Sequence, residues 1–242
     1  MKQLKDKVAV ITGGNSGIGY ATAKKLKEHG AEVIITGRRK EAVEKAAATL
    51  GVTGIIADQS RVSDIEALAQ QVKASFATID ILVVNAGITK FSAIEQTEES
   101  RFDEMMNVNF KGAYFTLSRF IPLLREGASV IMLSSTSATI SPQSASVYAA
   151  GKAAINAVVK IAALELASRK IRVNAVSPGP VATEIMQKIG LDETLENQLL
   201  QSIPLGRMGK AEEVADMIRY LAGEEAAFLT GANFLVDGGQ SI

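Results

Sequence analysis

A tyrosine and a lysine lie four residues apart in the stretch SVYAAGKAA, at positions 148 and 152. On a helix this spacing places a phenol and an ammonium on the same face. A free phenol, with a pKa near ~10, exchanges protons poorly at neutral pH, and a neighbouring cation favours its phenolate form. Tyr148 and Lys152 are therefore a candidate proton-donating pair. The alternative is a packed Tyr and a solvated Lys, because Y-x-x-x-K alone is a common pattern.

A second suggestive stretch follows an apolar run near the N-terminus. VAVIT (8–12) leads directly into GGNSGIG and then into a helical pattern. Glycines permit a tight turn whose backbone N–H groups approach a pyrophosphate, and the helix N-terminus favours negative charge. We expect a dinucleotide-binding turn here; the alternative is a tight turn with helix-packing glycines. The expected contacts are Gly13, Asn15, Ser16, Gly17, Ile18 and Gly19.

The end of the next apolar run, EVIITGRRK, bears on the choice of cofactor. In a dinucleotide fold an acidic residue here binds the ribose 2′-hydroxyl, whereas an arginine accommodates a 2′-phosphate. Gly37 stands in place of the acid, and Arg38 and Arg39 follow it. Guanidinium groups bind phosphate in a bidentate manner. We predict NADP(H), with NAD(H) possible; the alternative is that RRK is only a solvated helix start.

Two further loops follow apolar runs and are expected at the same edge of a sheet. Asp58 in ADQS is placed to accept the adenine amino group. Asn85, Ala86 and Gly87 in VVNAG are small enough to let a cofactor pass. Ligands of open α/β sheets bind at this carboxyl edge of the strands.

The elements that must position these residues alternate between strand and helix along the chain. The runs are apolar on both faces, as in a parallel sheet covered on both sides. We predict a single-domain (1–242), Rossmann-type, doubly wound α/β fold of about seven parallel strands with helices on both faces. One long connection, 178–210, is expected to contain a substrate lid over 184–208. The predicted strands are 8–12, 32–36, 54–57, 81–84, 129–134, 171–176 and 233–236, and the predicted helices are 17–29, 39–50, 62–76, about 98–125, 147–168 and 211–222.

Composition argues against several other classes of protein. Lys+Arg and Asp+Glu are balanced at 26 each, so the chain has no excess of positive charge that would indicate binding to nucleic acid. There is no cysteine, and the only histidine, His29, ends the first predicted helix, so we expect no metal site. The N-terminal apolar run is too short for a signal peptide, and no apolar stretch is expected to approach the ~20 residues of a membrane span. We expect a cytoplasmic protein.

Taken together, the motifs resemble the short-chain dehydrogenase/reductases of the classical type. Each motif is weak alone, but they occur in family order and spacing from residue 8 to 239. One departure is Val84, where many members have asparagine, and that position is usually structural. The matching pieces are TGGNSGIG (12–19), NAG (85–87), NVN (107–109), SSTSAT (134–139), YAAGK (148–152), RVNAVSPG (172–179) and VDGG (236–239).

The resemblance implies a catalytic set of Asn109, Ser135, Tyr148 and Lys152. Ser135 lies at the family spacing of 13 residues before the tyrosine, and the adjacent Ser134 should point to the other side of the strand. Tyr148 would protonate a carbonyl oxygen that Ser135 also hydrogen-bonds. Lys152 would bind the nicotinamide ribose as well, and Asn109 would hold a water that connects Lys152 to solvent.

The resemblance also implies contacts from the turn after the sixth strand. Val181 would meet the nicotinamide amide through its backbone, and Thr183 would reach a phosphate, with Pro178 and Gly179 beside the cofactor. The mostly apolar expected pocket favours hydrophobic ketones. Its residues are Ser137, Ile140, Gln143, Ala145, Pro180, Ile185, Met186 and Ile189.

The leading hypothesis is an NADP(H)-dependent reductase that converts ketones or aldehydes to alcohols, assembled as a homotetramer. One alternative is a 3-oxoacyl-(acyl-carrier-protein) reductase, which needs a basic docking patch. Another is a sugar or polyol dehydrogenase, and a third, from a different class, is a dinucleotide-binding scaffold without catalysis. Candidates for the docking patch are Arg119, Arg125, Arg169 and Arg172.

Overall fold

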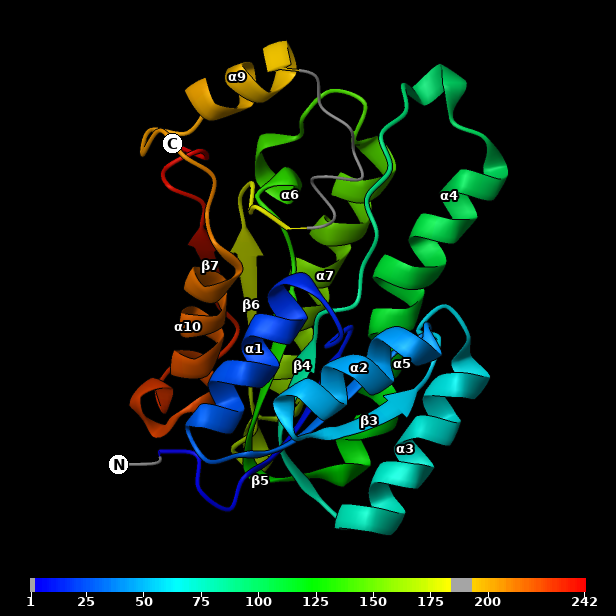
Figure 1. Cartoon of the computed structure of the whole chain (residues 1–242), viewed down its shortest axis with the longest axis vertical. Coiled ribbons are helices and arrows are strands. Elements are labelled where there is room, and N and C mark those ends of the chain that lie inside the picture. Colours follow the sequence, from blue (N-terminus) through cyan, green and yellow to red (C-terminus); the bar gives the residue numbers. More distant parts are fainter. Residues whose placement is uncertain (1–2, 184–192) are drawn as a thin grey trace.

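The computed structural model describes residues 3–183 and 193–242, and its strands form one parallel sheet (Figure 1). The strand order is β3-β2-β1-β4-β5-β6-β7. The chain therefore starts in the middle of the sheet, winds to one edge, returns to the middle and winds to the other. This confirms the doubly wound fold. The strands are β1 (Val8–Thr12), β2 (Glu32–Gly37), β3 (Thr53–Ile56), β4 (Ile79–Val84), β5 (Leu124–Leu133), β6 (Arg172–Pro178) and β7 (Asn233–Val236).

Side chains of the central strands alternate between two apolar cores. Val10 of β1 pairs in register with Ile34 of β2 and Leu82 of β4, and all three belong to the core on one face. Their neighbours Ile11 and Ile35 belong to the core on the other face. Successive residues of a strand point to opposite sides, so a sheet covered on both faces needs apolar residues at every position.

Helices cover both faces of this sheet. The first layer is α1 (Gly17–Glu28), α2 (Lys40–Leu50) and α10 (Ala211–Ala222). The second layer is α3 (Val62–Phe76), α5 (Ala113–Phe120) and α7 (Ser146–Glu165). Shorter or peripheral helices are α4 (Glu99–Met106), α6 (Ser137–Ile140) and α9 (Glu193–Gln201), with 3₁₀ turns η1 (Ile94–Gln96), η3 (Ile121–Leu123), η4 (Ala167–Arg169) and η5 (Glu224–Ala226).

The prediction of a single helix over about 98–125 is wrong. The chain forms α4, then a π-helical segment η2 (Asn107–Gly112), then α5 and η3, and β5 begins at Leu124. Pro122 lies at the start of η3 and supplies no backbone N–H, which ends the α-helical pattern. Leu124 pairs with Ile79 of β4 across a register irregularity.

Helix α7 corrects another expectation. By length and composition it is apolar enough to cross a membrane, with a mean hydropathy of 1.4 over its most apolar stretch. The expectation that no stretch approaches a membrane span is therefore wrong for α7. The core helices of water-soluble proteins meet the same criteria, and α7 packs on β5 and β6.

Candidate active site

The proton-donating pair lies side by side on α7. The Nζ of Lys152 is 5.8 Å from the centre of the Tyr148 ring and donates a hydrogen bond to the carbonyl of Leu133 at 2.7 Å. Leu133 is the last residue of β5, so the pair lies at the carboxyl end of a central strand. Only 5% of Lys152 is exposed.

Burial alters the charge behaviour of Lys152. Burial lowers the pKa of its ammonium below the ordinary 10.5, and the neighbouring Tyr148 acts in the opposite direction to a smaller extent. A buried cation gains from any negative charge that develops next to it. The arrangement can therefore stabilise a phenolate at Tyr148.

The two serines at the end of β5 have different partners. Ser134 donates its hydroxyl proton to the carbonyl of Lys152 at 3.1 Å, which fastens α7 to the strand end. Ser135 instead accepts the N–H of Ser137 at 3.1 Å. Its own hydroxyl proton has no acceptor in the part of the chain that the structure describes. Ser135 can therefore donate to an incoming oxygen.

Asn109 lies in the π segment and is engaged by the loop after β4. Its Oδ1 accepts the N–H of Ile88 at 2.8 Å, and its Nδ2 donates to the carbonyl of Ile88 at 2.8 Å. A Cβ added to Gly87 would lie 3.2 Å from Asn109 Oδ1 and 3.7 Å from Lys152 Nζ. Three of the predicted residues thus meet at one point. The side chain of Asn109 holds this loop, and its water-holding role stays a prediction.

The glycine turn is tightly packed between β1 and α1. Gly13 has a φ of +66°, and a Cβ at Gly19 would lie 2.3 Å from the carbonyl oxygen of Gly13. Asn85 Nδ2 donates to the carbonyls of Thr12 and Gly13 at 2.8 and 3.2 Å. Asn85 was expected to line the cofactor, and the structure adds that its amide holds the turn in shape.

Sequence reasoning missed the contribution of Thr12 to this turn. Its Oγ1 accepts the backbone N–H groups of both Asn85 and Ala86 at 3.0 Å. The hydroxyl thereby joins the ends of β1 and β4. Two signals pointed to Thr12: it is a threonine at the end of an otherwise apolar strand, and it begins the motif TGGNSGIG.

The N-terminus of α1 is equipped to receive an anion. Ser16 is its N-cap residue, yet its hydroxyl makes no capping bond to the helix. The position of a Cβ on Gly17, which has a φ of +53°, is 3.5 Å from Cγ2 of Thr183. Two hydroxyl-bearing residues from distant parts of the chain therefore flank free helix N–H groups, which suit a pyrophosphate.

Val181 forms a parallel bridge with Gly209, and its contact with the nicotinamide amide stays a prediction. Gly209 bonds to the carbonyl of Pro180 and to the amide of Ala182, both at 2.9 Å. In such a parallel bridge the amide and carbonyl of the middle residue, Val181, point to the opposite side. They are thus available to a ligand. Pro178 and Gly179 are bonded within the fold, to Thr136 and to Val236.

At the end of β2, Gly37 occupies the position where an acidic side chain would bind a ribose 2′-hydroxyl. A Cβ at Gly37 would lie 2.3 Å from Oδ1 of Asn15, so the Asn15 side chain lies over the glycine. Arg38 and Arg39 follow, and both are exposed. Asp58 uses Oδ1 to accept the N–H and hydroxyl of Ser60 at 2.9 and 2.8 Å, which leaves its other oxygen for the adenine. The residues present therefore fit a nicotinamide dinucleotide.

The predicted substrate residues are only partly brought together. Ala145 is 1% exposed and offers no surface to a substrate, because it closes the turn into α7; that prediction is wrong. Gln143 lines a hollow of about 910 Å³ shared with Ala93 and Ala149. Ser137 and Pro180 are half-buried, and Ile140 is exposed. Ile185, Met186 and Ile189 lie outside the described residues, as does the first part of the predicted lid 184–208, whose second part includes α9.

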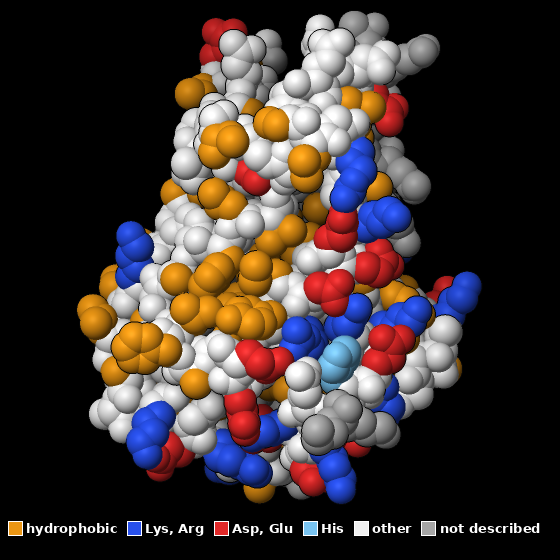
Figure 2. Space-filling model, turned by 90° about the vertical axis from the view of Figure 1, so that its left-hand side faces the viewer, with side chains coloured by type: hydrophobic (Ala, Val, Ile, Leu, Met, Phe, Trp, Pro, Cys, Tyr) orange, Lys and Arg blue, Asp and Glu red, His pale blue; other side chains and the backbone are white. Residues whose placement is uncertain are grey.

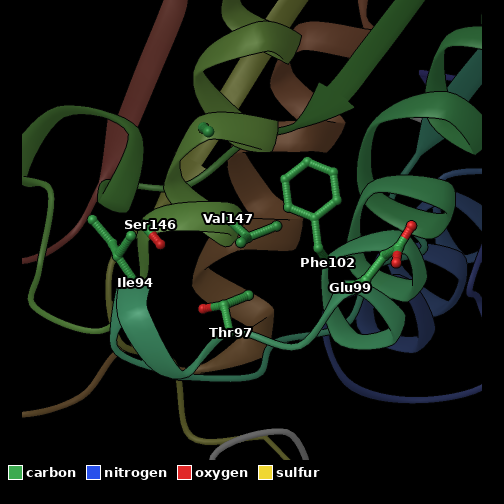
Figure 3. Close-up of a pocket in the computed structure, with 7 residues that line it drawn as sticks. Ile94, Thr97, Glu99, Phe102, Ser146 and Val147 are labelled. Atoms are coloured by element: carbon green, nitrogen blue, oxygen red, sulfur yellow. The ribbon is translucent and has the colours of Figure 1, made fainter.

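A second hollow of about 470 Å³ lies between η1, α4 and α7, and we call it the α4–α7 groove. In Figure 3 the ring of Phe102 is directed toward Val147, while the carboxylate of Glu99 points away from both. None of the four predicted catalytic residues lines either hollow. The groove is lined by Ile94, Thr97, Glu99, Phe102, Ser146, Val147 and Ala150.

The arginines considered for a carrier-docking patch all have partners within the fold. Arg125 and Arg172 lie at the starts of β5 and β6, the edge of the sheet opposite Tyr148. Arg125 pairs with Asp80 at 3.5 Å, and Arg172 donates to the carbonyl of Gly223 at 3.1 Å. The other two are also engaged, Arg119 with Glu66 and Arg169 with the carbonyls of Ile121 and Leu124.

Comparison with known proteins identifies relatives over the full length of the chain. A family model described as enoyl-(acyl carrier protein) reductase matches residues 13–241. An oxidoreductase of Sarocladium schorii is 37% identical over 99% of this chain and 97% of its own. A 3-oxoacyl-[acyl-carrier-protein] reductase of Chlamydia muridarum is 36% identical over 98% of both chains. An NADP-dependent (R)-specific alcohol dehydrogenase of Lentilactobacillus kefiri is 35% identical over 98% of this chain and 97% of its own.

The fold has equally similar solved structures. A short-chain dehydrogenase/reductase from Serratia marcescens superposes with a TM-score of 0.94 at 34% identity, covering 99% of this chain and all of its own.

Proposed function

The chain belongs to the short-chain dehydrogenase/reductase family, oxidoreductases that act on CH–OH donors with a nicotinamide dinucleotide, and from this premise we propose that it is an NADP(H)-dependent reductase of ketones and aldehydes. The observation that carries the proposal is the buried Lys152 beside Tyr148, next to the uncommitted hydroxyl of Ser135. A protein that only bound a dinucleotide would not need this set.

The reaction divides between cofactor and protein. Hydride transfer to the carbonyl carbon is the chemistry that a dinucleotide would supply when bound. Tyr148 gives its phenolic proton to the carbonyl oxygen, and Ser135 donates a hydrogen bond to the same oxygen as negative charge develops. The ammonium of Lys152 stabilises the phenolate that remains. In the reverse direction the phenolate takes the proton from an alcohol.

The residues that would hold the phosphates and the nicotinamide amide follow the ends of β1, β2 and β6. Ser16, Gly17 and Thr183 would hold the pyrophosphate, and Val181 would meet the nicotinamide amide. Arg38 and Arg39 would bind the 2′-phosphate, since Gly37 carries no competing carboxylate. One relative is NADP-dependent by name, which supports the preference. The measurement is kcat/KM for NADPH against NADH with one ketone, and a higher value with NADH would contradict the preference.

We propose a hydrophobic ketone as substrate because the described part of the expected pocket has no charged anchor. The carrier-linked alternative has a namesake among the relatives. However, the four arginines considered for carrier docking are engaged within the fold, two of them at the far edge of the sheet. A screen of ketones, β-ketoesters, sugars and acyl thioesters separates these alternatives and the polyol dehydrogenase. The class of compound with the highest kcat/KM identifies the substrate class.

The Tyr148→Phe variant tests catalysis itself. It keeps the ring and removes the hydroxyl group that carries the proton, so NADPH binding should survive while turnover falls by at least about 10²-fold. Binding is measured by the fluorescence of NADPH and turnover by its absorbance. A wild-type protein that binds NADPH and reduces nothing in the screen would favour the scaffold alternative.

We also propose a homotetramer. Ile161 and Leu164 on α7 are 55% and 80% exposed, and the α4–α7 groove continues apolar surface on that side. A second apolar area lies on the side of α10 and β7, where Figure 2 shows hydrophobic side chains gathered over the middle of the molecule. From that end of the chain, Phe228 is fully exposed and Leu235 of β7 is 46% exposed. Large apolar patches mark protein interfaces.

A further inference from the structure

Gln59 joins two segments that form the site, although nothing in the sequence motifs singles it out. It lies in the loop between β3 and α3 and is 8% exposed. Its Nε2 donates to the carbonyl of Ala86 at 2.9 Å and to the carbonyl of Val108 at 3.0 Å. Two carbonyl partners fix which end of the carboxamide is the nitrogen. The amide therefore clamps the loop after β4 to the π segment η2.

This clamp has a counterpart two residues further along the loop and one residue further along the π segment. Asn109 follows Val108 and binds the main chain of Ile88, as described above. Gly87 lies between the two clamped positions and faces Lys152 Nζ. The separation of loop and π segment thus determines how much space remains above the ammonium.

Gln59 is also packed closely against Gly112, the last residue of the π segment. A Cβ at Gly112, the last residue of η2, would lie 2.0 Å from the carbonyl oxygen of Gln59 and 2.8 Å from its Cγ. The Oε1 of Gln59 is buried and has no partner among the described residues. A buried unsatisfied acceptor is unfavourable, so the residue is not explained by folding stability alone. π turns of this kind occur frequently at functional sites.

We propose that Gln59 is a positioning residue for catalysis, which sets the spacing between Gly87 and Asn109 and so keeps bulk water away from Lys152, apart from the single water that Asn109 would hold. The inference rests on the proposed roles of Tyr148 and Lys152. Losing the clamp would let the loop and the π segment separate. Water would then reach Lys152, and the pKa of its ammonium would rise toward the ordinary value.

The test is Gln59→Met, which keeps the length of the side chain and removes both hydrogen bonds. With NADPH and a β-ketoester that the wild-type enzyme reduces, we expect kcat to fall by about tenfold or more. The pH at which kcat declines should move upward, while KM for NADPH changes little. An unchanged kcat and pH profile would overturn the inference.

Two further variants complete the design. Asn174→Leu is the matched control, because Asn174 is a fully buried carboxamide that clamps Leu229 and Ala232 near the start of β6. It should lower thermal stability and leave the pH profile of kcat unchanged.

Gln59→Glu should retain more activity than Gln59→Met, since a buried carboxyl stays protonated and can donate one hydrogen bond. If Gln59→Met does not fold, Gln59→Ala takes its place, and an unchanged kcat and pH profile in that variant would overturn the inference. Failure of the proposed function would be detected separately, because turnover would then survive in the Tyr148→Phe variant.

Discussion

At the scale of single residues, Lys152 combines a cost to folding with a benefit to catalysis. Removing an ammonium from water is unfavourable unless partners compensate, and its described partners are the Leu133 carbonyl and the Tyr148 ring. The lowered pKa of Lys152 expresses this cost. The same burial strengthens its effect on a phenolate beside it.

The Lys152→Met variant separates these two effects. We expect kcat to fall by at least about 10²-fold, because the cation that stabilises the phenolate is lost. The melting temperature should stay equal or rise, because a buried charge is replaced by an apolar chain of similar length. Steady-state kinetics and thermal denaturation measure the two quantities. Lys160→Met, an exposed position on the same helix, is the control and should change neither. A clear drop in melting temperature for Lys152→Met alone would contradict the account.

The lowered pKa also predicts opposite pH trends for activity and stability. Carbonyl reduction needs the protonated ammonium, so kcat should be full at pH values below the pKa of Lys152 and decline as pH rises through it. Between that pKa and 10.5 the unfolded chain holds the proton and the folded chain does not, so stability should increase with pH there. Urea denaturation at several pH values, compared with Lys152→Met, measures this contribution. If the wild-type trend persists in Lys152→Met, another group is responsible.

Gly37 gives a prediction about the cofactor. Gly37→Asp should raise the kcat/KM ratio of NADH over NADPH by about tenfold or more, because a carboxylate repels the 2′-phosphate and accepts from the 2′-hydroxyl. Asn15 must swing aside for any Cβ at this position. Gly37→Ala is therefore the control: it imposes the same displacement without charge and should leave the ratio near that of wild type. Equal ratios for the two variants would contradict the assignment of Arg38 and Arg39.

At the scale of elements, local patterns predict what local forces determine. The bounds predicted for β1, β7, α3 and α10 agree with the structure because each is a short apolar or amphipathic period between clear breaks. The π segment was missed because NVNFKG continues the helical pattern on both sides. Its last residue, Gly112, packs against Gln59, and no local stretch of sequence contains this contact.

Two glycines of neighbouring helices test this interpretation of the π segment. A Cβ at Gly112 would collide with the Gln59 carbonyl, whereas a Cβ at Gly151 of α7 would meet nothing closer than Met106 Sδ at 3.7 Å. Gly112→Ala should destabilise the protein by about 1–3 kcal/mol through overpacking. Gly151→Ala should be neutral or stabilise it by up to about 1 kcal/mol through helix propensity. Chemical denaturation measures the free energy of unfolding of both variants. Equal values would show that the π segment can shift to accept a Cβ at Gly112 without loss of stability.

At the scale of the whole molecule, the topology assembles a site whose parts are scattered along the chain. The ends of β1, β4, β5 and β6 are neighbours in the sheet, so the glycine turn, the NAG loop, Ser135 and Thr183 reach one edge. The element order predicted this convergence. The sequence could not show which polar groups remain free: Asn85 is engaged by the glycine turn, and Arg125 lies at the opposite edge. These outcomes depend on long-range partners.

Exposed apolar side chains give the last prediction, which concerns assembly. Leu164 on α7 and Phe228 before β7 lie in the two areas proposed as interfaces, and each is largely exposed in the single chain. We expect the wild-type protein to have about four times the chain mass of 25.6 kDa in solution. Leu164→Glu and Phe228→Asp should each reduce the mass, because a charge buried in an apolar interface is strongly unfavourable. The double variant should have the mass of a single chain, as measured by light scattering. Ala48→Lys on the exposed side of α2 is the control and should leave the mass unchanged. A wild-type monomer, or a full-sized assembly in Leu164→Glu, would show that this surface is not buried between copies of the chain.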